Sequence, residues 1–203
     1  TFNVGVAEAN MACVAAGMAS YGLIPFITTF APFASRRIFD QVTISIAYAG
    51  RSVKIVGTDP GIAAELNGGT HTGVDDIGMM RGVPGMVVYE PVDNVQLAQA
   101  LPQIVAHDGP VYIRMFRKGI ADVFGPDYKF DLFKADVLRE GADVTLFASR
   151  IEVAKALEAA GPLERDGVRA EVTNVHTLKP IDKEPILRSP SKTRAPAPAD
   201  HPR

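Results

Sequence analysis

The amino-acid sequence predicts an α/β fold: a mainly parallel sheet with helices on both faces, followed by a truncated second α/β domain. Short apolar segments of strand length alternate with longer amphipathic segments of helix length, the order typical of parallel sheets. The 203 residues are 47% hydrophobic and 22% charged, which suffices for a hydrophobic core and excludes wholesale disorder. The single cysteine, Cys13, excludes an internal disulfide framework and a cysteine-rich metal site.

The first part of the chain carries the clearest alternation. Its expected strands are short apolar runs bounded by glycine, proline or small polar residues: residues 2–6, 24–28, 53–57, 86–89 and 111–115. Its expected helices cover residues 8–21 and 35–49, with a third from an Asp93 N-cap through about Ala106. Because helical segments connect the strands, we expect the strands to run parallel.

A second strand–helix–strand unit is expected at residues 143–148, 151–160 and 168–175. Before it the pattern weakens, and the segment Phe124-Gly-Pro-Asp-Tyr128 reads as a surface connection. Residues 189–203 hold four prolines and no aliphatic side chain larger than alanine, so we expect them to be disordered. The expected organisation is a first domain over 1–118 with an incomplete N-terminus, a linker over 119–136, a partial domain over 137–188 and a disordered tail over 189–203.

Charge and motif content exclude several classes of function. The formal net charge is −2, and without a basic excess we expect no nucleic-acid partner. Apolar runs end well before membrane-spanning length and the N-terminus has no basic region, so we expect no membrane association and a cytoplasmic location. The sequence lacks the G-x-x-x-x-G-K-[ST], G-x-G-x-x-G and G-x-S-x-G motifs and any zinc-binding spacing.

Two acid–base candidates stand next to expected strands. The glycine-rich loop over residues 58–74 presents His71, which can donate, accept or shuttle a proton beyond the carboxyl end of a strand. An ordinary connecting loop with an incidental histidine explains that spacing slightly better. Glu8 begins a helix, where a carboxylate commonly does no more than complement the helix dipole.

Two further groups suit the binding of a ligand. Phe30 and Phe33 are spaced for stacking on a planar ring, although such a pair more often belongs to a hydrophobic core. Arg114, Arg117 and Lys118 follow or end an expected strand and suit either a phosphate or a solvated sheet edge.

Five blocks in this order resemble the pyrimidine-binding domain of the transketolase family of thiamine-diphosphate enzymes. The blocks read NVGVAEANM, IPFITTFAPFASRRIFDQV, GGTH, DDIGMMRGVPGMVVYEPVD and PVYIRMFRKG. The segment LKPID over residues 178–182 resembles part of the family's C-terminal domain. The wording GGTHTGVDDIG is similar to that of the split or short transketolases, in which this domain forms the C-terminal subunit.

The resemblance implies a role for each matching residue. Glu8 falls on the glutamate that hydrogen-bonds N1′ of the aminopyrimidine, favouring the tautomer whose 4′ nitrogen removes the thiazolium C2 proton. Burial in an apolar interface is expected to raise the pKa of that carboxyl. Phe30 and Phe33 fall on aromatics that pack against the pyrimidine, His71 on a substrate-facing catalytic histidine, and Arg117 on a phosphate-binding arginine.

Two positions depart from the family pattern. Asn67 replaces an aspartate that contacts the substrate's C2 hydroxyl, and Asp59 replaces a substrate-binding histidine. An aspartate beside a phosphate is expected to repel it. The family binds Mg²⁺ and the cofactor diphosphate through a G-D-G motif that this sequence lacks, so these ligands are expected from a diphosphate-binding partner domain or subunit.

The expected function is two-carbon ketol transfer between sugar phosphates by an oligomeric assembly, with thiamine diphosphate as cofactor and no metal ligand in this chain. A non-catalytic truncated fragment is the alternative, and the isolated chain is expected to be inactive. Relatives of 1-deoxyxylulose-5-phosphate synthase and of the 2-oxoacid dehydrogenase β chain share much of the scaffold. Arg117, which falls on a phosphate-binding arginine of the transketolase family, argues weakly against a relative of the 2-oxoacid dehydrogenase.

Overall fold

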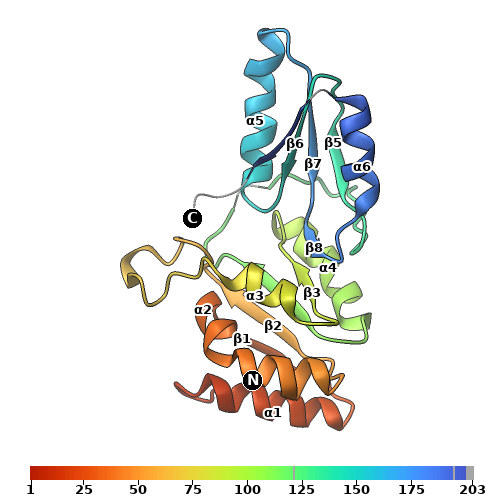
Figure 1. The fold of residues 1–203 in the computed structure, drawn as a ribbon. Coiled ribbons are helices and arrows are strands. Elements are labelled where there is room, and N and C mark those ends of the chain that lie inside the picture. Colours follow the sequence, from red (N-terminus) through yellow and green to blue (C-terminus); the bar gives the residue numbers. More distant parts are fainter. Residues whose placement is uncertain (121, 194, 200–203) are drawn as a thin grey trace. The chain divides into compact units, whose positions relative to one another are not determined.

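The computed structural model describes residues 1–120, 122–193 and 195–199 and divides into two compact units. The first unit comprises Thr1–Tyr89 and Pro102–Gly119. The second comprises Glu90–Leu101 and the described residues from Ile120 onward. Both units combine helices with mostly parallel strands, which confirms the α/β class (Figure 1). Within the described residues, no helix is long and apolar enough to cross a membrane.

The first unit is built on parallel strands in the order β1-β2-β4-β3. The strands are β1 (Phe26–Phe30), β2 (Lys54–Thr58), β3 (Val87–Tyr89) and β4 (Val111–Met115). Ile55 and Tyr112, which are neighbours across β2 and β4, are both fully buried. The expected parallel sheet is therefore confirmed. Helix α1 (Glu8–Ser20) packs beside β1, and α3 (Asp76–Gly82) precedes β3 (Figure 1).

The single helix expected over residues 35–49 forms as two shorter pieces, the 3₁₀ turn η1 (Arg36–Ile38) and the π-helical η2 (Gln41–Tyr48). A short helix that the sequence did not predict, α2 (Ala31–Ala34), precedes them. The Ser35 hydroxyl donates to the Ala31 carbonyl at 2.6 Å, and such back-bonding favours a bend. The apolar face survives the breaks, because Ile38, Val42 and Ile46 are fully buried.

The strand expected over residues 2–6 is wrong. This segment is irregular up to the start of α1, and the side chains of Phe2 and Val6 are 82% and 92% exposed. Alternating apolar residues stabilise a strand only when one face is buried, and these side chains bury neither face.

The second unit has the strand order β5-β7-β6-β9, in which only the β5–β7 pair is antiparallel. Helices α5 and α6 flank this sheet (Figure 1), and α5 closes a core around Val153, Ala160 and Val172. Helix α4 begins in this unit and ends in the first. The bounds are α4 (Asn94–Ala106), β5 (Asp136–Arg139), β6 (Val144–Ala148), α5 (Glu152–Arg165), β7 (Ala170–Asn174), β8 (Thr177–Lys179), α6 (Lys183–Lys192) and β9 (Ala195–Ala199).

The disorder expected over residues 189–203 is wrong for its described part. Helix α6 continues to Lys192, and β9 pairs with β6 at the end of the strand order. Polar contacts hold the segment, since Ser189 and Lys192 bond the Glu171 carboxylate at 2.6 and 2.9 Å. Two prolines are tolerated in β9 because an edge strand leaves N–H positions unpaired. Residues 194 and 200–203 of the expected tail lie outside the described residues.

The connection over residues 124–128 is packed rather than a surface loop. The Phe124 and Tyr128 rings stack with centroids 3.8 Å apart, and Phe124 is buried. Asp93 ties this segment to α4. Its Oδ1 accepts the Gln96 N–H at 2.8 Å, which confirms the expected N-cap, and its Oδ2 accepts the Val123 and Phe124 N–H groups at 2.7 Å each.

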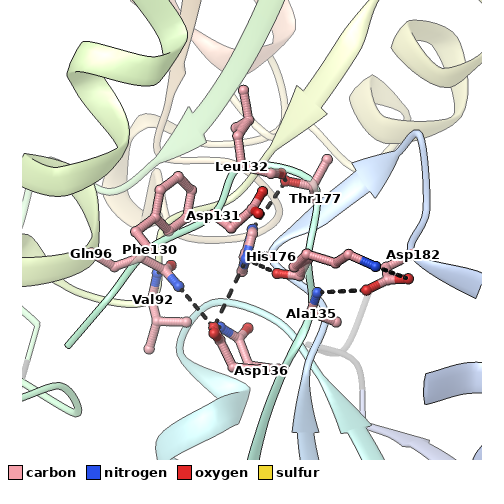
Figure 2. A network of polar contacts seen from close by, with 12 residues as sticks. Val92, Gln96, Phe130, Asp131, Leu132, Ala135, Asp136, His176, Thr177 and Asp182 are labelled. Atoms are coloured by element: carbon pink, nitrogen blue, oxygen red, sulfur yellow. Dashed lines mark hydrogen bonds and ion pairs between the residues drawn. The ribbon is translucent and has the colours of Figure 1, made fainter. Parts of the chain in front are cut away.

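A buried histidine lies at the centre of a polar network in the second unit (Figure 2). The His176 Nε2–H donates to the Lys134 carbonyl at 2.7 Å and lies 3.8 Å from an Asp136 carboxylate oxygen. That oxygen accepts bonds from Tyr128 at 2.8 Å and Asn174 at 3.0 Å. Burial lowers the pKa of His176 to about 4 and raises the pKa of Asp136.

We predict that buried His176 makes the folded chain less stable in mild acid. With a native pKa near 4 and an ordinary unfolded value near 6.5, the unfolded chain binds the additional proton between these limits. The contribution of His176 to the free energy of unfolding should therefore fall by about 2 kcal/mol between pH 7 and pH 5. Denaturant titrations of wild type and His176→Asn at both pH values measure this difference. Asp136 acts in both chains, so parallel pH profiles would contradict the assignment to His176.

Candidate active site

Three strands of the first unit end at one edge of the sheet. Phe30 of β1, Thr58 of β2 and Met115 of β4 stand in register, and each is the last residue of its strand. The carboxyl ends of parallel strands are the usual place for ligands in open α/β sheets. The chain therefore delivers the residues that follow, including Asp59 and Arg117, to the same edge.

An aromatic cluster lies at this edge. The Phe30 and Phe33 rings meet edge to face with centroids 6.1 Å apart. The His71 imidazole packs against both, at 4.9 Å from each centroid. In the sequence the two phenylalanines share one segment and His71 lies in another, and the structure brings all three into one contact set.

Glu8 joins this cluster through an arginine. Both carboxylate oxygens of Glu8 accept from Nη1 of Arg37 at 3.1 Å, and the guanidinium carbon of Arg37 lies 3.9 Å from the centroid of Phe33. The Glu8 side chain is 11% exposed, and it stands in the first turn of α1 where the helix dipole favours a negative charge. Sequence reasoning assigned no role to Arg37. Arg37 stands near Phe33 in the sequence, but no local pattern links it to Glu8, which lies 29 positions away.

Arg117 closes the other side of the cluster. Its guanidinium carbon lies 4.4 Å from the centroid of Phe30. Asp59 accepts the Arg117 backbone N–H at 3.1 Å and pairs with its Nε. The sequence predicted that Asp59 repels a phosphate, and the structure gives this carboxylate a positive partner within the protein.

Asn67 lies beside these residues on an open pocket of about 280 Å³. The pocket is lined by Asp59, Ala63, Ala64, Glu65, Leu66, Asn67, Arg117 and Lys118. Asn67 is exposed at the end of η3 (Glu65–Asn67). All six residues expected at the site (Glu8, Phe30, Phe33, Asn67, His71, Arg117) thus belong to the first unit.

The basic cluster at the end of β4 separates into three different environments. Arg114 is buried and its Nε donates to the Asp76 carboxylate at 2.8 Å, which also accepts from the Tyr112 hydroxyl at 2.8 Å. Lys118 pairs with Glu65 at 2.9 Å on the surface. Of these three basic residues, Arg117 is the one whose guanidinium lies over an aromatic ring of the cluster, whereas the buried Arg114 supports the sheet.

Glycine at position 57 makes room for this support. A Cβ built on Gly57 would overlap the Tyr112 side chain, the residue whose hydroxyl reaches Asp76. Any larger residue at this position of β2 would displace the tyrosine from the buried ion pair.

Comparison with known families identifies the class to which this α/β chain belongs. Residues 1–121 match the family described as transketolase, pyrimidine binding domain, and residues 133–196 match transketolase, C-terminal domain. The first match covers more than half of the chain. The chain therefore belongs to the transketolase family.

Two individual relatives within this family show how similar the chain is to known proteins. The chain is 59% identical over 193 residues to a 6-deoxy-6-sulfo-D-fructose transketolase subunit of Clostridium sp. (strain MSTE9), covering 95% of this chain and 60% of that protein. It is 35% identical over 195 residues to 1-deoxy-D-xylulose-5-phosphate synthase of Pelotomaculum thermopropionicum, covering 95% of this chain and 30% of that enzyme.

A solved structure described as a split gene transketolase, inactive beta4 tetramer, superposes with a TM-score of 0.89 at 42% identity. The match covers 98% of this chain and 64% of that one. The chain thus spans about 60% of the length of the first of these relatives.

We predict that substitution of the buried Arg114 lowers the stability of the first unit strongly. Arg114→Gln removes the positive partner of the buried Asp76 carboxylate, which then keeps the Tyr112 hydroxyl but pairs with no cation at position 114. The free energy of unfolding of the first unit should therefore fall by about 3–5 kcal/mol. Lys118→Gln breaks an exposed pair and should cost less than about 1 kcal/mol. Denaturant titration followed by circular dichroism measures both. Equal losses would show that Arg114 is not the structural arginine.

Proposed function

We propose that the chain is the pyrimidine-binding part of a transketolase-like enzyme, a transferase that moves a two-carbon ketol unit between sugars with an anionic terminus. The observation that carries the proposal is the contiguous set of contacts from Glu8 through Arg37, Phe33, His71 and Phe30 to Arg117. It offers a carboxyl, flat aromatic surface, an imidazole and a cation along one edge of the sheet.

The residues present fit the pyrimidine half of thiamine diphosphate. An aminopyrimidine requires a hydrogen-bonding carboxyl at N1′ and an apolar surface for its ring. Glu8 offers the carboxyl and Phe33 the apolar surface, and the two lie near each other because both contact Arg37. The bound cofactor supplies a nucleophilic carbon that a protein side chain cannot provide. In the proposal Glu8 holds the proton at N1′, while Phe30 and Phe33 pack against the ring.

The remaining residues act on the sugar. His71 exchanges a proton with a substrate hydroxyl, Asn67 hydrogen-bonds the hydroxyl at C2, and Arg117 binds the anionic terminus. We assign the ligands of the diphosphate and Mg²⁺ to a partner subunit. Among the described residues no group of three or more His, Cys, Asp or Glu side chains could hold a metal ion. We further propose that the assembly is oligomeric and cytoplasmic.

A specific observation favours one variant of the substrate. The relative at 59% identity is named for 6-deoxy-6-sulfo-D-fructose, in which a sulfonate stands where common ketoses of this size carry a phosphate. Transfer from a sulfonated ketose is therefore the second candidate beside transfer between sugar phosphates.

Glu8→Gln tests the catalytic assignment. In the assembly with a diphosphate-binding subunit and saturating cofactor, exchange of the cofactor's C2 proton should slow by about 10²–10⁴-fold, because an amide cannot exchange a proton with N1′. Exchange of this proton against deuterium is followed by NMR.

The matched control is Glu152→Gln. Glu152 also stands in the first turn of a helix and pairs with a basic residue, Lys155, at 2.8 Å. The Glu152→Gln substitution should leave the exchange rate of the cofactor's C2 proton unchanged. Equal exchange in Glu8→Gln and wild type would reduce Glu8 to a helix-end carboxylate and would remove the main support of the proposed function.

Arg37 is expected to compete with the pyrimidine. It covers the Phe33 ring and occupies both oxygens of Glu8, so a ring that uses these groups must displace it. Arg37→Gln should tighten the binding of thiamine to the isolated chain by about threefold to tenfold. Calorimetric titration measures the affinity, with Arg36→Gln as control because Arg36 pairs with Asp75 instead. Weaker binding in Arg37→Gln would identify Arg37 as a ligand-binding group.

A further inference from the structure

The positive charge of Arg117 is already compensated before any substrate arrives. The Asp59 carboxylate accepts two bonds from the same arginine, one from its backbone N–H and one from its Nε. The Asp59 side chain is only 5% exposed, whereas that of Arg117 is 57% exposed. The carboxylate is therefore held in place beneath the arginine, and the outer part of the guanidinium faces solvent.

The rest of the pocket adds no net charge. Among the described residues, the other charged groups that line it are Lys118 and Glu65, which pair with each other at 2.9 Å. The described lining thus holds two cations and two anions. Its neutral lining consists of three apolar side chains and Asn67.

The terminal group of the substrate determines how well this pocket can bind it. A phosphate monoester carries about −1.5 to −2 charges at pH 7. A sulfonate has the same tetrahedral array of three oxygens but only one negative charge. Because Asp59 already compensates Arg117, an incoming anion gains hydrogen bonds from the exposed part of the guanidinium but little net charge attraction. The second charge of a phosphate then adds repulsion from the Asp59 carboxylate that a sulfonate does not meet.

We propose that Asp59 is a specificity-determining residue that adapts the Arg117 pocket to a singly charged sulfonate in preference to a doubly charged phosphate. This inference rests on the proposed function. It assigns the substrate class as ketoses whose far terminus is a sulfonate.

A purely structural role for Asp59 makes a different prediction. Its bond to the Arg117 N–H joins the segments that follow β2 and β4, and this bond alone explains a buried aspartate. Asp59→Asn separates the two roles, because the amide oxygen still accepts the backbone N–H while the charge is lost. If Asp59 has only a structural role, Asp59→Asn should leave the preference between sulfonate and phosphate unchanged.

The test compares two donors in the assembly of this chain with a diphosphate-binding subunit. The donors are 6-deoxy-6-sulfofructose and fructose 6-phosphate, and the readout is the ratio of their kcat/KM values. Wild type should favour the sulfonate, and Asp59→Asn should shift the ratio towards the phosphate by about tenfold or more. The control is Glu164→Gln, which removes one carboxylate from an exposed pair with Arg139 in the second unit and should leave the ratio unchanged.

A binding measurement without turnover supports the kinetic one. Ethanesulfonate and ethyl phosphate are titrated into the full chain and followed through the NMR signal of the Arg117 Nε–H. The phosphate should gain more affinity than the sulfonate in Asp59→Asn.

Each outcome bears on one of the two proposals. Turnover of both donors with an unchanged ratio in Asp59→Asn overturns the inference and leaves the proposed function standing. An equal shift in Glu164→Gln also overturns it, because the effect would then reflect overall charge. Lack of ketol transfer from either donor, together with normal C2-proton exchange in Glu8→Gln, overturns the proposed function and the inference with it.

Discussion

The parallel pairing of β2 with both β1 and β4 is the constraint on which the candidate site depends. The common register ends all three strands at one level, at Phe30, Thr58 and Met115. A shift of one residue in either pairing would turn each following side chain to the opposite face. The aromatic ring of Phe30, the carboxylate of Asp59 and the guanidinium of Arg117 meet only because this register is kept.

Three largely buried carboxylates of the first unit repeat one arrangement, in which each pairs with an arginine from a distant part of the chain. The pairs are Glu8 with Arg37, Asp59 with Arg117 and Asp76 with Arg114. They differ in the exposure of the arginine, which is buried beside Asp76 but about half exposed in the other two pairs. A buried arginine is part of the framework, whereas an exposed one can exchange its partner for a ligand.

Sequence reasoning succeeded where a local pattern determines the outcome. The parallel strands follow from short apolar runs, and the Asp93 N-cap follows from a residue type at a helix start. It failed where distant contacts decide. The alternation in residues 2–6 had no partner to bury it, and the contacts of Ser189 and Lys192 with Glu171 order a proline-rich segment whose composition predicts disorder.

The candidate site shows the same division. Its members were found by resemblance of short blocks, but the partnership of Arg37 with Glu8 joins residues 29 positions apart and leaves no local signal. The compensation of Arg117 by Asp59 joins residues 58 positions apart. The chemistry of such a site depends on pairs, and pairs between distant segments become visible only in the folded chain.

The division of α4 between the two units has an evolutionary consequence. Recombination exchanges domains most easily when each domain is one uninterrupted stretch of gene, but the second unit here also includes Glu90–Leu101. A graft that began at Ile120 would leave behind Asp93, whose carboxylate accepts the N–H groups of Val123 and Phe124. Swapping this C-terminal unit between relatives would therefore require the first turns of α4 to travel with it, or a recipient whose own helix presents an acceptor at the same place.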